Sequence, residues 1–301
     1  MLSAMKHLLT DWRFRRNLGK YNSRMSADMA APFTAFHARC RAAYAPRAIA
    51  NDITTAASQF AEDGFASYWS PRLQPLAEAM LAKVKEMEAS GDPWDADYVF
   101  KGDAWLEFPE LEEAFKAGLA DFIESIYGSH LKVFYAKLYK AVRTTDRPTG
   151  SQLWHSDGGP GTCINLMLYL SEGTRENGAM EVVSWKDTRE IFTEERPAMR
   201  RIMAQHKGEK LSRLQARELL TAWYAGQIAT RGVTIQQPTG APGLALAFRN
   251  NTIHKGGFPN PDHVRYVIVL HVYPSLLPLD YASYRRNGAA KTGSQPADPA
   301  F

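Results

Sequence analysis

The sequence Trp154-His155-Ser156-Asp157 holds the pattern on which the interpretation of this chain depends, together with Asn250-Asn251-Thr252-Ile253-His254 about a hundred residues further on. Side chains alternate between the two faces of a β-strand, so His155 and Asp157 are expected to point the same way. An imidazole and a carboxylate on one face can bind a single metal ion. His254 is the best candidate for the third ligand, and these three residues are therefore the predicted metal site.

Two histidines and one carboxylate on one side of a metal leave the opposite side open, which is the donor set of non-heme Fe(II) oxygenases. A lone His-x-Asp pair is weak evidence, but Arg265 follows His254 by eleven residues, at the start of a strand-like run. Arginine presents a planar fork that can bind a carboxylate through two hydrogen bonds. No acid on that strand is placed to pair with Arg265, and a buried cation is costly without an anion. The sequence therefore predicts that Arg265 binds the carboxylate of an organic acid.

The second half of the chain contains short runs rich in β-branched and aromatic residues, separated by glycine and proline. Strands are expected at 131–143, 152–156, 163–170, 179–185, 233–237, 244–249 and 264–273. This pattern is typical of an antiparallel double-stranded β-helix of the jelly-roll or cupin type. The earlier part of the chain has helical periodicity, with helices expected near 54–64, 73–88 and 109–127. The predicted fold is a mainly β core with N-terminal helices packed outside it.

The chain is expected to form a single domain over residues 1–301. Residues 1–130 are its mostly helical part, and 131–275 form the jelly-roll core. The segment 186–229 is charged and helix-prone, and it is too long for a simple connection between strands. It is either a solvated helix pair or a lid over the metal site. Residues 289–301 are rich in Pro, Ala, Gly and Ser and are expected to be a disordered tail.

Charged residues make up 23% of the chain and hydrophobic residues 45%, with a net charge of +4, which is normal for a soluble globular protein. The charges are spread along the chain, so no nucleic-acid partner is expected. Cys40 and Cys163 form no CxxC pair, which favours a reducing cytoplasm. No apolar run is long enough for an integral membrane segment. The basic Met1–Met25 segment is expected to be a solvated helix, with a transit peptide or a membrane-surface helix as alternatives.

Several stretches together resemble the phytanoyl-CoA dioxygenase (PhyH-like) family of Fe(II)/2-oxoglutarate-dependent oxygenases. The His-x-Asp pair, the distant histidine and the arginine eleven residues later have the family's order. Phe60–Phe65 resembles the family's opening helix-to-strand segment, Glu176–Val183 its Asn-Gly-Ala strand, and Gly256–Pro261 its turn after the second histidine. The resemblance covers roughly residues 50–275.

The resemblance implies that His155, Asp157 and His254 bind Fe(II) and carry the catalysis, and that Arg265 holds the distal carboxylate of the co-substrate 2-oxoglutarate. It further implies a dioxygenase that uses O2 to hydroxylate or otherwise oxidise a C–H bond of a small-molecule substrate, with release of succinate and CO2. Halogenases of this superfamily have Gly or Ala at the position of Asp157, which leaves a place for chloride. Hydroxylation is therefore favoured over halogenation.

Three further residues are candidates for cofactor binding. Relatives often use a basic residue on the strand before His-x-Asp, and Lys140 matches that position best, with Lys137 and Arg143 on the opposite face as rivals. Asn165 and Gln152 are expected to contact 2-oxoglutarate or the substrate.

Two positions depart from the family's pattern. Ser184–Asp187 stands where Pro-Gly-Ser-His is usual, so the edge of the substrate pocket is expected to be particular to this chain. Gly256 stands where relatives can carry a hydroxyl residue that assists the arginine. Trp154, Trp185 and Arg249 could line the pocket, although core packing is the preferred role for the tryptophans.

Two other classes of protein stay open. The first is a cupin-like metal enzyme of another class, such as a zinc hydrolase or isomerase, which would use the same three ligands without an oxoacid. The second is a non-catalytic binding or sensor relative. The presence of all four residues, the three ligands and Arg265, argues against a protein that has lost its chemistry.

Overall fold

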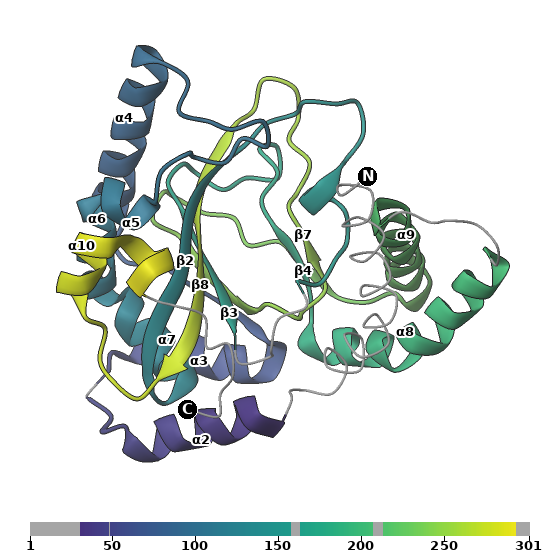
Figure 1. Ribbon diagram of the computed structural model, residues 1–301, viewed down its shortest axis with the longest axis horizontal. Helices are drawn as coiled ribbons and strands as arrows, with labels where there is room; N and C mark the ends of the chain where they lie inside the picture. The colour runs from purple at the N-terminus through teal and green to yellow at the C-terminus, as the bar shows by residue number, and fades with distance from the viewer. Residues whose placement is uncertain (1–30, 48, 158–162, 207–212, 293–301) are drawn as a thin grey trace, which may run out of the picture.

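Two antiparallel sheets lie at the centre of the molecule (Figure 1). The computed structural model describes residues 31–47, 49–157, 163–206 and 213–292. The larger sheet has the strand order β1-β6-β3-β8-β2 and the smaller one β5-β4-β7. The strands of the larger sheet are β1 (Phe65–Tyr68), β6 (Ala245–Arg249), β3 (Ile164–Tyr169), β8 (Arg265–Ser275) and β2 (His130–Ala141). Those of the smaller sheet are β5 (Ile235–Gln236), β4 (Glu181–Val183) and β7 (His254–Lys255).

The inner faces of the two sheets enclose one hydrophobic core. The register puts Asn165 of β3 opposite His271 of β8, and Met167 opposite Val269. Because side chains alternate along a strand, His271 and Val269 share the inner face of β8 with Arg265. The inner core consists of apolar side chains from both sheets: Phe65, Met167, Tyr169, Met180, Val182, Leu244, Leu246, Phe248 and Val267.

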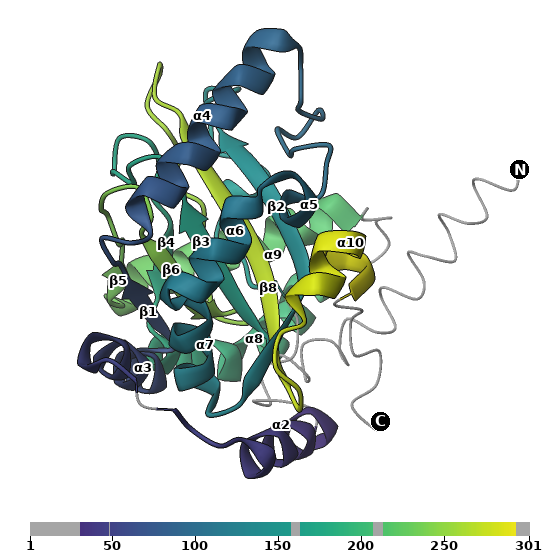
Figure 2. The same cartoon turned by 90° about the vertical axis from the view of Figure 1, so that its left-hand side faces the viewer.

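Helices from both ends of the described chain cover the outer face of the larger sheet (Figure 2). They are α3 (Asn51–Asp63), α4 (Gln74–Ser90), α5 (Ala104–Glu107), α6 (Pro109–Ala114), α7 (Ala120–Tyr127) and α10 (Tyr281–Thr292), with α2 (Ala31–Ala43) beside them. A π-helical turn, Phe115–Leu119, joins α6 to α7. Their apolar residues form the largest core cluster with the outer side chains of β2, β3, β6 and β8.

The long segment between β4 and β5 forms two helices, α8 (Trp185–Gln205) and α9 (Arg213–Arg231), on the far side of the smaller sheet (Figure 1). Their apolar side chains join Trp154, Val183 and Ile253 in a separate cluster. His155 and His254, the neighbours of Trp154 and Ile253, face the inner core instead. The described part of this insertion therefore packs behind the predicted ligands, and a lid over their open side stays a prediction.

The double-stranded β-helix core with helices outside and a helical insertion between strands confirms the predicted fold. Two local predictions are wrong. No strand forms at 152–156: a 3-10 turn, Gly150–Gln152, ends where it was expected to begin, and of the residues that follow only His155 forms a β-bridge, with His254. Helix α10 extends through residues 289–292, where a disordered tail was expected, since Ala289 is buried and its N–H donates to Asp103 Oδ2 at 3.1 Å.

The remaining tail residues, from 293 on, and the basic Met1–Met25 segment lie outside the described residues. Among the helices that are described, none combines the length and the apolar character needed to cross a membrane.

Candidate metal centre

His155, Asp157 and His254 converge at one point. A pair of backbone hydrogen bonds joins the two histidines in an antiparallel bridge, with N–O distances of 2.9 and 2.8 Å. Asp157 Oδ1 lies 3.5 Å from His155 Nε2, and Asp157 Oδ2 lies 3.7 Å from His254 Nε2. One donor atom from each residue lies within 4.8 Å of the other two. This spacing suits three ligands around a single ion of the size of iron or zinc.

Both imidazole rings are fixed through their other nitrogen. His155 Nδ1 lies 2.7 Å from the carbonyl oxygen of Leu153, and His254 Nδ1 lies 2.7 Å from that of Thr252. A carbonyl oxygen only accepts, so each Nδ1 carries the proton in these bonds. With Nδ1 on a carbonyl, Nε2 is the ring nitrogen that faces Asp157 in both histidines. Metal-binding histidines are oriented in this way in many proteins.

Asp157 is held by two further contacts. Its backbone N–H donates to Asn250 O at 3.0 Å, and Asn165 Nδ2 donates to its Oδ2 at 2.5 Å. Burial disfavours the charged form of this carboxyl group. The adjacent His254 and His155 and the Asn165 donor outweigh burial and hold the pKa of Asp157 well below its usual range. The carboxylate is therefore ionised and available as a ligand.

His254 is only 4% exposed, and its ring packs 4.8 Å from the Phe248 ring. Burial and the neighbouring His155 lower the pKa of His254 to about 4. The imidazole is thus neutral at physiological pH, which is the form that binds a metal.

Arg265 lies buried on the inner face of β8, with 4% of its surface exposed. Its Nη1 donates to the carbonyl oxygen of Gly178, and its guanidinium lies 5.4 Å from the centre of the Tyr169 ring. It forms no ion pair with any acid in the described part of the chain, and its Nε has no hydrogen-bond partner there. Burial lowers its pKa. A buried, unpaired guanidinium is costly, so this side chain is prepared for an anionic guest.

Gly256 leaves space beside that guanidinium. A Cβ atom on Gly256 would lie 4.0 Å from Arg265 Nη2. Gly178 is needed for a different reason: its φ is +75°, and a Cβ atom there would lie 2.4 Å from the carbonyl oxygen of Gly257. The close approach of these two glycines positions the Gly178 carbonyl for Arg265.

Lys140 does not reach this site, which corrects its prediction as a cofactor-binding residue. It pairs in register with Tyr266, so it points to the outer face of β2, away from Arg265. Its Nζ lies 2.6 Å from Glu88 Oε1 on α4. Of its rivals, Lys137 donates to Gly102 O at 2.8 Å and Arg143 to Thr145 O at 3.3 Å. Both bonds are to loop carbonyls, and neither is to the Arg265 site.

Gln152 is also engaged elsewhere. Its side-chain oxygen accepts the backbone N–H of Thr149 at 3.1 Å and so closes the turn before Trp154. Asn165, by contrast, lies at the site, where it contacts the predicted ligand Asp157.

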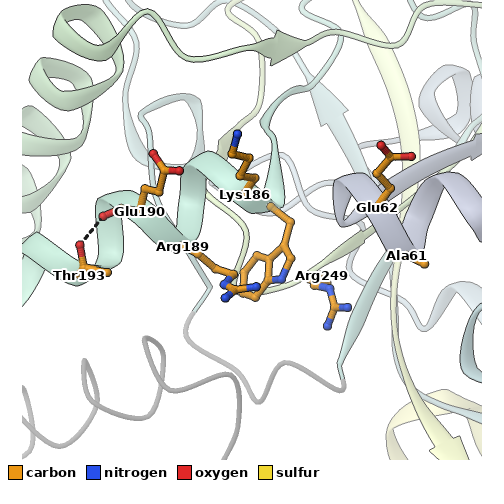
Figure 3. Close-up of a pocket in the computed structure, with 8 residues that line it drawn as sticks. Ala61, Glu62, Lys186, Arg189, Glu190, Thr193 and Arg249 are labelled. Atoms are coloured by element: carbon orange, nitrogen blue, oxygen red, sulfur yellow. Dashed lines mark hydrogen bonds between the residues drawn. The ribbon is translucent and has the colours of Figure 1, made fainter.

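The other suggested pocket residues lie on the outer side of the smaller sheet. Trp154 and Trp185 belong to the cluster under α8 and α9, as core packing predicts. Arg249 lies 5.1 Å from the Trp185 ring and lines a surface pocket of about 600 Å³ between α3 and α8 (Figure 3). None of the three predicted ligands lines this pocket.

The structure adds one supporting residue that the sequence analysis missed. Thr188 of α8 is fully buried, and its Oγ1 accepts the backbone N–H of Ile253 at 3.2 Å. The Ile253 carbonyl accepts the Val183 N–H at 2.9 Å. The residue before His254 is thus fixed on both sides, by a contact between segments 65 residues apart that no local signal reveals.

Comparison with solved structures gives the same fold in metal-dependent enzymes. The non-heme α-ketoglutarate-dependent carbocyclase SnoK from nogalamycin biosynthesis has a TM-score of 0.52 at 17% identity, over 77% of this chain and 87% of that one. EctD from S. alaskensis with bound Fe has a TM-score of 0.53 at 18% identity, over 75% and 79%. The epimerase SnoN in complex with Fe3+, α-ketoglutarate and nogalamycin RO has a TM-score of 0.50 at 15% identity, over 74% and 83%.

At these identities the likeness establishes a shared fold. No protein-family model matches the sequence, and no curated protein matches it either. Membership of the PhyH-like family therefore stays a prediction.

Proposed function

We propose that this protein is an Fe(II)/2-oxoglutarate-dependent dioxygenase that hydroxylates, or otherwise oxidises, a C–H bond of a small molecule. The observation that carries the proposal is the presence of two features in the same double-stranded β-helix core. A cluster of two imidazoles and one carboxylate matches the facial donor set of non-heme iron enzymes. Arg265 is buried on the inner face of β8 and has no acidic partner among the described residues.

The residues present fit the implied cofactors. His155, Asp157 and His254 would hold Fe(II) through two Nε2 atoms and a carboxylate oxygen, with the opposite side of the ion left for 2-oxoglutarate and O2. Arg265 would bind the distal carboxylate of 2-oxoglutarate through its guanidinium, whose Nε has no partner among the described residues. Bound Fe(II) supplies the activation of O2, coupled to decarboxylation of 2-oxoglutarate to succinate and CO2.

The chain's own contribution is orientation and protection. The carbonyls of Leu153 and Thr252 hold the two imidazoles in the metal-binding tautomer. Asn165 holds the carboxylate of Asp157. The packed inner core keeps water from the buried side of the site, so one substrate C–H bond can be presented in a fixed position.

SnoN is named as an epimerase and SnoK as a carbocyclase, so the shared fold does not select one reaction. Hydroxylation or a related oxidation is favoured over halogenation, because the carboxylate of Asp157 would fill the coordination place that a halogenase leaves for chloride. The two cysteines are buried and unpaired, which supports the predicted location in a reducing cytoplasm.

Binding of Mn(II), a redox-stable substitute for Fe(II), tests the metal site by calorimetry. His254→Ala removes one of three ligands and is expected to weaken Mn(II) binding by more than about 100-fold. His263→Ala is the matched control, because His263 also has its Nδ1 on a carbonyl two residues earlier but lies exposed in a turn. Unchanged binding in His254→Ala would refute the metal site.

The co-substrate is tested in the same preparation. 2-Oxoglutarate is expected to bind only when a metal is present, and Fe(II) with O2 is expected to give succinate. A zinc hydrolase or isomerase would bind metal yet show neither oxoacid binding nor succinate. A non-catalytic relative would give no succinate with any substrate tested.

A further inference from the structure

The pocket between α3 and α8 carries charged side chains that the proposed chemistry does not use (Figure 3). We call it the α3–α8 pocket. Its volume of about 600 Å³ lies in the range of small-molecule sites. None of the three predicted metal ligands lines it, so it is separate from the candidate metal centre. Five of the side chains that line it are charged: Glu62, Lys186, Arg189, Glu190 and Arg249.

Close packing of two helix ends builds this pocket. Gly64 ends α3 in a left-handed conformation, with a φ of +75°. A Cβ atom on Gly64 would lie 2.4 Å from Cβ of Trp185, the first residue of α8, so glycine allows the two helix ends to touch. Trp185 is only 6% exposed. Together with Ala61 of α3, it gives the pocket lining a small apolar surface.

Helix α8 contributes its part of the lining from one face. The residues concerned are three and four positions apart, which makes them neighbours on a helix: Lys186, Arg189, Glu190 and Thr193. All four are exposed. Their side chains therefore come from adjoining turns of one helix, and they can contact a single ligand.

Arg249 adds a positive charge from the end of β6. Its guanidinium lies 5.1 Å from the centre of the Trp185 ring and 5.6 Å from that of the Phe60 ring. Contacts with two aromatic rings restrain a guanidinium. The backbone N–H of Arg249 also donates to the carbonyl oxygen of Gly64 at 3.0 Å. This half-buried charge is therefore held in place at the pocket.

The other four charged groups form no ion pair within the described part of the chain. They are Glu62, Lys186, Arg189 and Glu190. Lys186 and Glu190 are four residues apart, a spacing at which opposite charges on a helix often pair. Elsewhere on α8, Glu194 does pair with Arg231 of α9, at 2.5 Å. The charges around the pocket are therefore available to a ligand.

The positive and negative groups point to different sides of the pocket. In Figure 3, Arg189 and Arg249 extend toward one side, whereas Glu62, Lys186 and Glu190 extend toward the other. The first side carries two positive charges. The second carries two negative charges and one positive charge. The pocket is thus dipolar, and neither a simple anion nor a simple cation complements both of its sides.

We propose that the α3–α8 pocket binds a small zwitterion of the amino acid type. Its carboxylate would contact Arg189 and Arg249, because an arginine can bind a carboxylate through two hydrogen bonds. Its ammonium group would lie on the side of Glu62 and Glu190. The site does not rest on the proposed function, since no predicted metal ligand takes part in it.

The test measures binding of three probes to the full-length protein by calorimetry. L-Phenylalanine carries both charges, 3-phenylpropionate lacks the ammonium group, and phenethylamine lacks the carboxylate. We expect L-phenylalanine to bind at least about tenfold more tightly than either of the other two. The measurement is made without metal and again with Mn(II) and 2-oxoglutarate, which would occupy Arg265 and keep the carboxylate probes from it. Added salt should weaken binding, because the charged groups of α8 are exposed.

Variants locate the binding. Arg189→Gln removes one positive charge and should weaken L-phenylalanine binding by about tenfold. Glu190→Gln and Glu62→Gln should each weaken it by about 3- to 10-fold and leave 3-phenylpropionate binding no weaker than before. Arg200→Gln is the matched control, because Arg200 is an exposed arginine of α8 that does not line the pocket.

Equal binding of 3-phenylpropionate or of phenethylamine would overturn the proposal. So would unchanged L-phenylalanine binding in Arg189→Gln, or no binding up to about 10 mM. These outcomes are separate from failure of the proposed function. If Mn(II) and 2-oxoglutarate bind but L-phenylalanine does not, only the α3–α8 pocket is wrongly assigned. If L-phenylalanine binds there and Mn(II) does not bind, only the proposed function is wrong.

Discussion

At the scale of single residues, the most informative feature is the buried guanidinium of Arg265. Its position lowers the stability of the ligand-free fold, because a desolvated charge is retained without an ion-pair partner in the described chain. An anionic ligand that pairs with the guanidinium would offset the cost of burying its charge. Stability and function are then opposed at this one side chain.

Arg265→Met tests this opposition. Replacing the buried charge by an apolar side chain is expected to raise the free energy of unfolding of the ligand-free protein by about 1–4 kcal/mol. It should also abolish 2-oxoglutarate binding in the Mn(II)-loaded protein. Thermal unfolding with and without 2-oxoglutarate measures both effects. A variant that is less stable and still binds the oxoacid would contradict this account.

For Lys140 we expect the reverse of the effects expected for Arg265→Met: a loss of stability and no change in 2-oxoglutarate binding. Its ammonium group pairs with Glu88, which also accepts from Trp94 and Tyr266. Burial opposes the charge on Glu88, but the Lys140 contact and its neighbours lower the pKa of Glu88 to about 2. Lys140→Met should cost about 1–2 kcal/mol in urea unfolding and leave 2-oxoglutarate affinity unchanged. Lys101→Met, at an exposed lysine, is the control.

The sequence predicted the three ligands correctly as a group that converges in space, and their role in metal binding stays a prediction. The error at Lys140 has a physical origin. Both faces of β2 carry apolar residues, since helices cover the outer face and the second sheet covers the inner one, so alternation alone cannot tell inside from outside. The bulge after Val133 also shifts the alternation of side chains between the two faces of β2.

At the scale of elements, the insertion of α8 and α9 packs behind the three predicted ligands. Thr188 provides the direct link, because its hydroxyl accepts the N–H of the residue before His254. An amphipathic helix pair could be predicted from sequence, but its docking surface could not. A stripe of apolar residues indicates that a partner surface exists and does not say which face of which sheet provides it.

Thr188→Val tests this support. Valine keeps the shape and leaves the buried Ile253 N–H without a partner, which should cost about 1–3 kcal/mol of stability. If the contact positions His254, Mn(II) affinity should also fall by about 10-fold or more. Thr188→Ser retains the hydroxyl and should restore metal affinity. Loss of stability with unchanged Mn(II) affinity would show a structural role only.

At the scale of the whole molecule, one buried carboxyl group links stability to pH. Glu195 of α8 is 2% exposed, and its Oε2 accepts from the hydroxyl of Tyr224 on α9 at 2.7 Å. Burial raises its pKa to about 7, and the Tyr224 bond offsets burial only in part. The pKa of Glu195 is higher in the folded state than in the unfolded state. The stability that the protonated carboxyl group contributes is therefore complete below about pH 4.5 and is lost as the pH rises toward 7.

Glu195→Gln should remove that dependence. Between pH 5 and 8, on the order of 3 kcal/mol of stability is expected to be lost by the wild type relative to the variant. Melting curves of both proteins, recorded at each pH in this range, measure the difference. The effects of other titrating groups are the same in both proteins and cancel. Parallel stability curves for the two proteins would show that Glu195 does not titrate in this interval.

The bridge between His155 and His254 has one more consequence. The chain between the first two predicted ligands and the third contains α8 and α9 as well as strands β3, β4, β5 and β6. A cut within that stretch would leave His155 and Asp157 on one polypeptide and His254 and Arg265 on another. Neither piece would hold all three predicted ligands, so binding of the metal would favour association of the two pieces.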